Sequence, residues 1–163
     1  DQAPSTTSPT CPVVTCEPFT TEAITTEGPT VTPNLEWRTV GADRFVRFDQ
    51  KITWNEARNV CRSHGLELYM PKDILNVSKY LDDTFSNGSG MWHWLGGRAN
   101  GTHMVWLSGD VLTREDPWYS TGYSYVSTNY CLYFLTHSGW ATKAQVLYSY
   151  LCDYDDKFYV VCG

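Results

Sequence analysis

The spacing of apolar residues predicts two amphipathic helices. In the first, four apolar residues recur at helical intervals and would share one inward face: Trp54, Ala57, Val60 and Cys61. Thr53 and Glu56 stand three residues apart just before this pattern, which is the form of a capping box. We therefore expect a helix that begins after Thr53, runs to about His64 and stops at Gly65.

The second helix is predicted from about Pro71 to Phe85. Its apolar residues again share one face at 100° per residue: Ile74, Val77, Leu81 and Phe85. Asn76 lies almost opposite this face and begins an Asn-x-Ser sequon. A glycan on Asn76 would point to water, so the sequon and the helix support each other.

Short β-rich runs follow, with no helical periodicity. Trp94-Leu95-Gly96-Gly97 suits a buried central strand, because the tryptophan fills volume and the glycines let another backbone approach. Asn100-Gly101 is a hairpin signal that leads into a strand at 105–107. Further strands are expected at 45–48, 131–134 and 158–162, whereas 108–130 shows no periodic pattern.

The first 33 residues have a different composition. They contain ten Thr, two Ser and six Pro, one aromatic residue and neither Lys nor Arg. Such a segment buries too little apolar surface to fold alone. We expect residues 1–34 to be a mucin-like, O-glycosylated stalk, with a disordered tail as the alternative, and residues 35–163 to be the folded domain. The candidate O-glycosylation sites are Thr6, Thr7, Thr20, Thr21, Thr25 and Thr26.

Charge and cysteine content indicate an extracellular protein. The net charge is −6, from 12 basic and 18 acidic residues, and no basic cluster favours nucleic acid or an anionic membrane as partner. No apolar run approaches the ~18 residues that span a bilayer. We expect a mature, secreted glycoprotein whose signal peptide has been removed, with six cysteines and sequons at Asn76, Asn87 and Asn100.

Five landmarks in order resemble the C-type lectin-like domain: Cys61 on a helix, Trp94-Leu95-Gly96, Cys131, Gly139-Trp140, and then Cys152 with Cys162. The resemblance covers Leu35 to Gly163. It implies an α+β fold with two helices, a mixed and mostly antiparallel sheet, a long loop region and stabilising disulfides. Three segments look most similar to secreted lectin-like proteins of arthropods: 44–48, 54–61 and 94–98.

The resemblance also implies how the cysteines pair. It places Cys131 with Cys152, and Cys162 supplies a partner for Cys61, for which a buried free thiol is the alternative. A bridge between Cys61 and Cys162 closes a loop of roughly 100 residues, worth about 4–5 kcal/mol by loop entropy. For Cys11 and Cys16 we predict a local bridge, with a link to another chain as the alternative.

The calcium–sugar site of C-type lectins would need oxygen ligands that are missing here. The family supplies a Glu-Pro-Asn or Gln-Pro-Asp triplet in the long loop and an Asn-Asp pair after the strand tryptophan, because calcium takes six to eight oxygens. Here Tyr123-Ser124-Tyr125 stands at the triplet, and Ala141-Thr142 follows Trp140. We therefore expect no calcium at the principal site and no other cofactor.

Calcium elsewhere is a weaker possibility. Asp110, Glu115 and Asp116 lie in the long loop, and three further acids precede the last strand at 153, 155 and 156. Because no spacing matches a known calcium loop, a solvated acidic surface is the favoured interpretation.

The long loop carries aromatic residues among small polar ones, which is the composition of a contact surface. The candidate ligand-binding residues are Trp118, Tyr119, Tyr123 and Tyr125. The alternative is that some of these rings belong to the core.

Nothing in the sequence favours catalysis. The four histidines show no metal-ligand spacing and no Gly-x-Ser-x-Gly elbow is present. The leading hypothesis is a secreted recognition module that binds an extracellular protein or glycan without the usual calcium site. The alternatives are a structural component that assembles with itself or a matrix, and a calcium lectin of innate immunity with displaced ligands.

Overall fold

The structure is a computed structural model that describes residues 35–86, 90–113, 127–136, 147–154 and 158–163. Residues 1–34, with Cys11, Cys16 and the candidate O-glycosylation sites, lie outside the described residues. The elements in chain order are β1 (Trp37–Val40), β2 (Asp43–Ile52), α1 (Trp54–Ser63), α2 (Ile74–Phe85), β3 (Met91–Ala99), β4 (Met104–Trp106), β5 (Val111–Leu112), β6 (Tyr130–Thr136), β7 (Leu147–Leu151) and β8 (Phe158–Cys162).

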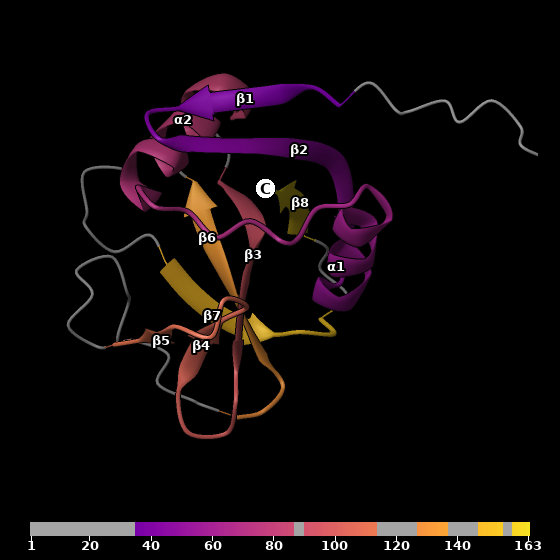
Figure 1. The fold of residues 1–163 in the computed structure, drawn as a ribbon, viewed down its shortest axis with the longest axis vertical. Coiled ribbons are helices and arrows are strands. Elements are labelled where there is room, and N and C mark those ends of the chain that lie inside the picture. The colour runs from indigo at the N-terminus through magenta and orange to yellow at the C-terminus, as the bar shows by residue number, and fades with distance from the viewer. Residues whose placement is uncertain (1–34, 87–89, 114–126, 137–146, 155–157) are drawn as a thin grey trace, which may run out of the picture. The chain divides into compact units, whose positions relative to one another are not determined.

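The described strands form one mixed sheet organised around β3 (Figure 1). β3 is parallel to β8 and antiparallel to β4 and β6. β8 in turn pairs with β2, β2 with β1, and β6 with β7, all antiparallel. The predicted α+β fold is therefore confirmed, with two helices and a mostly antiparallel sheet.

Both predicted helices form, and side chains cap them. Thr53 accepts from the backbone N–H of Glu56, while a Glu56 carboxylate oxygen accepts from the Thr53 backbone N–H at 2.9 Å, as the capping-box pattern predicts. Asp73 caps α2 by accepting from the Asn76 N–H at 3.2 Å. The buried Asp43 carboxylate accepts from the N–H groups of Lys72 and Asp73, which ties the start of β2 to the entry of α2.

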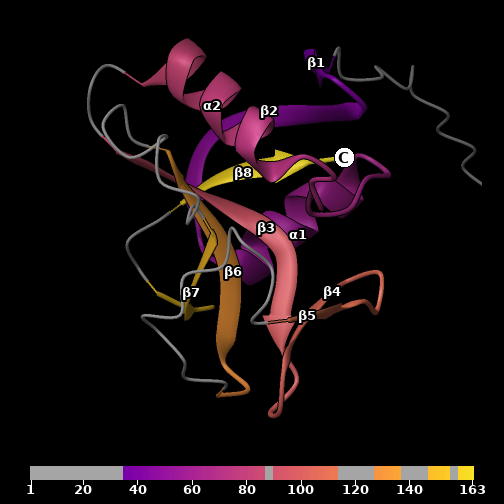
Figure 2. The ribbon, with the colours of Figure 1, turned by 90° about the vertical axis from the view of Figure 1, so that its left-hand side faces the viewer.

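The two helices bury their apolar faces in different clusters of the core. The ribbon shows α1 and α2 at separate places on the sheet (Figure 2). α2 places Val77 and Leu81 in a cluster with Leu132 and Phe134 of β6. α1 packs on β3 and β8, and its cluster contains Trp54, Ala57, Cys61, Trp94, Phe158, Val160 and both disulfides. Because side chains of a strand alternate between the faces of the sheet, β3, β6 and β8 each contribute buried residues to both clusters.

Gly96 of β3 makes the close backbone approach that the sequence predicts. A Cβ atom built on it would lie 2.4 Å from the Leu68 carbonyl oxygen and 2.8 Å from Cγ of Met70. The Gly96 N–H donates to the Tyr69 carbonyl at 2.8 Å, so the segment after α1 lies directly against the centre of the sheet. Only glycine leaves room for this contact.

Two disulfides join distant parts of the domain. Cys61 of α1 pairs with Cys162 of β8, with Cα atoms 5.5 Å apart, and Cys131 pairs with Cys152, with Cα atoms 5.0 Å apart. These are the pairings that the resemblance implied. Cys61 and Cys162 are both fully buried.

The sheet is larger than the sequence pattern indicated. β1, β5 and β7 had no predicted counterpart, and β2 extends on both sides of the expected 45–48 strand, with a register shift between Phe48 and Lys51. β7 alternates buried and half-buried residues, but its pattern is short and follows a segment outside the described residues. No helix in the described part of the chain is both long and apolar enough to cross a bilayer.

Candidate functional site

A groove lies on the sheet where β3, β6, β7 and β8 meet. We call it the aromatic groove, because every residue in the described part of the chain that lines it carries an aromatic ring: Trp92, Tyr133, Tyr150, Tyr154 and Phe158. Trp92 comes from β3, Tyr133 from β6 and Phe158 from β8, whereas Tyr150 and Tyr154 belong to β7 and the turn that follows it.

Strand alternation and register bring these rings together. Trp92 and Trp94 point to one face of β3, while His93 between them points to the other. Trp94 is opposite Tyr133 of β6 and Val160 of β8, which places Phe158 two residues away on the same face. The groove therefore lies on the face of the sheet that carries α1.

The two tryptophans of β3 differ in solvent exposure, because α1 covers one of them and not the other. Trp94 is fully buried and shares its cluster with Trp54 of α1. Trp92, two residues earlier on the same face, is 43% exposed. The same strand face is thus core at one end and open to solvent at the other.

Phe158 is buried and forms the floor of the groove. Its ring centroid lies 4.2 Å from Trp94, 4.8 Å from Tyr133 and 5.4 Å from Trp92, and all three pairs are tilted. On the other side, Tyr150 and Tyr154 meet edge to face at 4.5 Å. Contacts of this kind each add about 0.5–1.5 kcal/mol beyond area burial, so the rings hold one another in place.

A second hollow, of about 440 Å³, lies near β1, β2 and the end of α2, and its charges pair with one another. Arg38 is paired with Glu36, and Arg47 with Asp49 at 3.2 Å. The Arg47 guanidinium also lies over the rings of Phe85 and Tyr159, at 4.4 and 4.0 Å from the centroids. The Arg47 side chain is almost fully buried, so these contacts stabilise the fold and do not offer the guanidinium to a ligand.

His93 lies behind Arg47 in the core. Its Nε2 accepts from Nε of Arg47 at 3.3 Å, and its ring stacks on Phe134 at 5.1 Å. Burial lowers the pKa of His93 well below its usual value, and the positive charge of Arg47 lowers it further. His93 is therefore a neutral side chain of the core.

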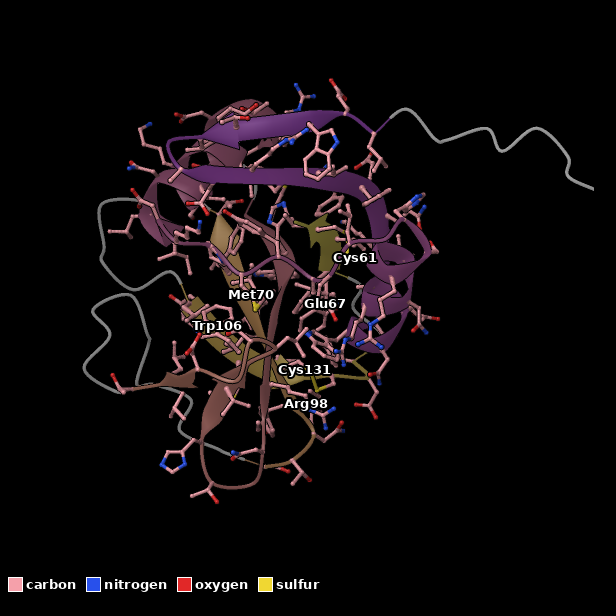
Figure 3. The ribbon with its side chains drawn as sticks, in the orientation of Figure 1. Cys61, Glu67, Met70, Arg98, Trp106 and Cys131 are labelled. Atoms are coloured by element: carbon pink, nitrogen blue, oxygen red, sulfur yellow. A yellow bond between two sulfur atoms is a disulfide. The ribbon has the colours of Figure 1, made fainter. Side chains whose placement is uncertain are left out.

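A third hollow, of about 410 Å³, is lined by residues of the segment after α1 and of the β4–β5 hairpin, among them Met70 and Trp106, which Figure 3 labels. Asp110, one of the weak calcium candidates, lines it. The Asp110 carboxylate accepts from the Ser108 hydroxyl at 2.8 Å within the hairpin turn. Among the residues that the structure describes, no three His, Cys, Asp or Glu side chains gather as metal ligands would.

The other predicted site residues fall in segments that the structure leaves undescribed. These are Trp118, Tyr119, Tyr123 and Tyr125, the calcium candidates Glu115 and Asp116, and the sequon residue Asn87. The positions that the resemblance assigned to calcium ligands, 123–125 and 141–142, lie there too. Their residue types do not fit calcium, since Tyr, Ser, Ala and Thr supply no carboxylate.

Two sequon residues are described, and both are exposed. Asn76 lies on the outer face of α2, as the helical pattern predicted. Asn100 begins the β3–β4 turn, where its side-chain oxygen accepts from the N–H groups of Thr102 and His103. An exposed asparagine on a helix surface or a turn is accessible to glycosylation, which remains a prediction for both.

Sequence reasoning did not find the aromatic groove. Two alternating patterns could have indicated it, Trp92-x-Trp94 and Tyr148-x-Tyr150, since each places two rings on one strand face. What the sequence does not contain is the register that brings Tyr133 and Phe158 beside Trp92.

Neither a protein-family model nor a curated protein sequence matches the chain. Solved structures do match. The C-type lectin TC14 from the tunicate Polyandrocarpa misakiensis superposes with a TM-score of 0.54 at 17% identity, over 78% of this chain and 96% of that one. The C-type lectin CEL-I from Cucumaria echinata superposes with a TM-score of 0.59 at 16% identity, over 83% and 96%.

The chain has the C-type lectin fold. A Ca²⁺-dependent type II antifreeze protein in its Ca²⁺-free form also superposes, with a TM-score of 0.57 at 14% identity, over 77% of this chain and 94% of that one. Proteins whose names indicate different ligands therefore share the C-type lectin fold. For this reason the function of this chain has to be inferred from its site and not from its fold.

Proposed function

We propose that this protein is a non-catalytic, extracellular recognition module that binds a glycan or a protein without the calcium–sugar site of C-type lectins. The observation that carries the proposal is a groove lined by aromatic side chains, on a lectin fold whose metal-ligand positions have no carboxylate. Aromatic rings supply contact area with few rotatable bonds, and tyrosine and tryptophan also offer polar tips.

Similar structures support recognition as the general role. Besides the lectins, a complex of SPL-1 with GlcNAc superposes with a TM-score of 0.58 at 13% identity. A mouse scavenger receptor C-type lectin carbohydrate-recognition domain does so with a TM-score of 0.56 at 15% identity. Carried over to this chain, these names favour an extracellular ligand, glycan or protein.

The same proposal includes the architecture expected from the sequence. A Thr/Pro-rich stalk over residues 1–34 would carry the lectin-like domain of residues 35–163 away from whatever anchors it. The two disulfides favour an oxidising, extracellular compartment. The aromatic loop residues Trp118, Tyr119, Tyr123 and Tyr125 remain candidate contacts alongside the aromatic groove.

A glycan array tests the proposal when the full chain is applied once with calcium and once with EDTA. Binding that EDTA leaves unchanged supports recognition without calcium. Binding that EDTA abolishes would contradict it and favour a calcium lectin with displaced ligands. If nothing binds and no extracellular protein binds either, the proposal is wrong and a structural, self-assembling role gains weight, which sizing with and without reductant then tests.

A further inference from the structure

The aromatic groove has room for one ring-sized group. Its volume is about 190 Å³, which corresponds to about six water molecules at ~30 Å³ each. Pockets for drug-sized ligands begin at roughly 300 Å³. The groove therefore suits a single ring of a longer ligand whose remainder stays in solvent.

The lining selects against an anionic group. The five described residues that line the groove are Trp, Tyr and Phe, and none of them has a basic side chain. A carboxylate or phosphate placed against these rings would lose hydration without gaining an oppositely charged partner among them. The ring that fits therefore carries no anionic group.

The lining also favours a ring with apolar faces and a polar edge. Ring faces carry partial negative charge and attract weakly positive C–H groups. Tyr150 and Tyr154 add phenol groups beside those faces. A neutral pyranose matches both features, since its faces present C–H groups and its edge presents hydroxyls.

Trp92 is the residue that such a sugar would contact. Large exposed apolar side chains are ordinary when they stand alone on a surface. Trp92 instead forms one wall of a hollow whose floor is the buried Phe158, at 5.4 Å between centroids. Its 43% exposure leaves part of the indole available to a ligand, while Phe158 fixes the rest.

We propose that the aromatic groove seats one neutral pyranose ring of a glycan against Trp92, without a metal ion. This inference rests on the proposed function, since it names the ligand class of the same groove. A proline-rich peptide is the competing ligand, because such peptides also bind aromatic-lined grooves. A polyproline helix advances ~3.1 Å per residue and contacts successive hollows, whereas this groove offers room for one ring.

The test uses the full chain in EDTA with two probes, an array of neutral oligosaccharides and a synthetic proline-rich peptide. Trp92→Ala should weaken binding of the best oligosaccharide at least about tenfold, because it removes a central aromatic contact. Tyr150→Phe keeps the ring and removes a hydroxyl, so it should weaken binding severalfold while folding normally. Leu75→Ala, at a 41% exposed site on α2, is the matched control and should change binding less than twofold.

The outcomes separate this inference from the proposed function. Loss of oligosaccharide binding in Trp92→Ala and its weakening in Tyr150→Phe, but not in Leu75→Ala, support the sugar site. If oligosaccharides bind all variants equally, the sugar site in the groove is wrong while recognition without calcium stands. If only the proline-rich peptide binds, and Trp92→Ala loses it, the ligand class is wrong. If EDTA abolishes all binding, the proposed function fails as well.

Discussion

Trp54 and Trp94 each donate an indole N–H to a backbone carbonyl close to the other residue. Nε1 of Trp54 donates to the Leu95 carbonyl, next to Trp94, at 2.8 Å, and Nε1 of Trp94 donates to the Ile52 carbonyl, two residues before Trp54, at 2.8 Å. The first bond joins α1 to β3 and the second joins β3 to the end of β2, and both rings are almost completely buried. Together they hold the start of α1 against β3, the strand that also carries Trp92.

We predict that Trp94→Phe destabilises the domain by about 2–4 kcal/mol. The substitution removes the bond to the Ile52 carbonyl and leaves a gap among the rings of Tyr133 and Phe158. Urea unfolding with the disulfides intact measures the change. Trp92→Phe is the control, and because Trp92 is partly exposed its cost should stay below about 1 kcal/mol. Equal costs at the two positions would contradict the described packing.

The two disulfides should differ in their contribution to stability. Cys61 and Cys162 are 101 residues apart in sequence, and Cys131 and Cys152 are 21 apart. Loop entropy then gives about 4.7 kcal/mol for the first bridge and about 3.3 kcal/mol for the second. Replacing each pair by alanine and comparing urea midpoints checks the order. A larger loss from the shorter loop would show that native packing, and not chain entropy, sets the difference.

Acidification should destabilise the domain through His93. Because burial and Arg47 depress the pKa of His93 in the folded state, the unfolded chain binds more protons below its ordinary pKa of about 6.5. The stabilising contribution is therefore complete above that pH and is lost as pH falls. Below pH 6.5 the free energy of unfolding should therefore fall by up to about 1.4 kcal/mol per pH unit, because the unfolded chain binds one proton that the folded state does not.

His93→Phe keeps an aromatic ring between Phe134 and Tyr159 and removes the titrating group. Its free energy of unfolding should change less between pH 7 and pH 5 than that of the wild type. His103→Asn, at an exposed turn position, should retain the wild-type slope. Partial burial raises the pKa of Glu67, but hydrogen bonds from Arg58 and the Leu68 N–H lower it, and the net direction is downward. The stability that Glu67 contributes is therefore present above its ordinary pKa of 4.5 and is lost only at more acidic pH than this comparison covers. The prediction fails if His93→Phe and the wild type share one pH profile.

Gly96→Ala should cost about 1–3 kcal/mol or more, because a methyl group there meets the Leu68 backbone and nothing nearby can move cheaply. At Gly97 the clash is with the side chain of Leu132, which can change rotamer. Thermal unfolding of the two single variants measures the difference, with Gly96→Ala expected to be the less stable. The reverse order would mean that the segment after α1 yields more easily than the Leu132 side chain.

Much of the scaffold could be predicted from local sequence. Local signals predicted both helices, because caps and helical periodicity act over a few residues. The Thr53–Glu56 capping box indicated where the first helix begins, and the apolar residues of 54–61 and 74–85 indicated which face of each helix is buried. Gly96 likewise indicated a close backbone approach. The short strands β1, β5 and β7 could not be predicted, since pairing with distant strands rather than local pattern stabilises them.

The sequence by itself determined the helices, the central Trp94 strand and the Thr/Pro-rich composition of the first 33 residues. Only the tertiary structure decided that Trp92, Tyr133, Tyr150, Tyr154 and Phe158 line one groove while Trp94 is core. The physical reason is that strand register and the position of α1 set which rings meet and which remain open to solvent. Neither is a property of any single segment of the chain.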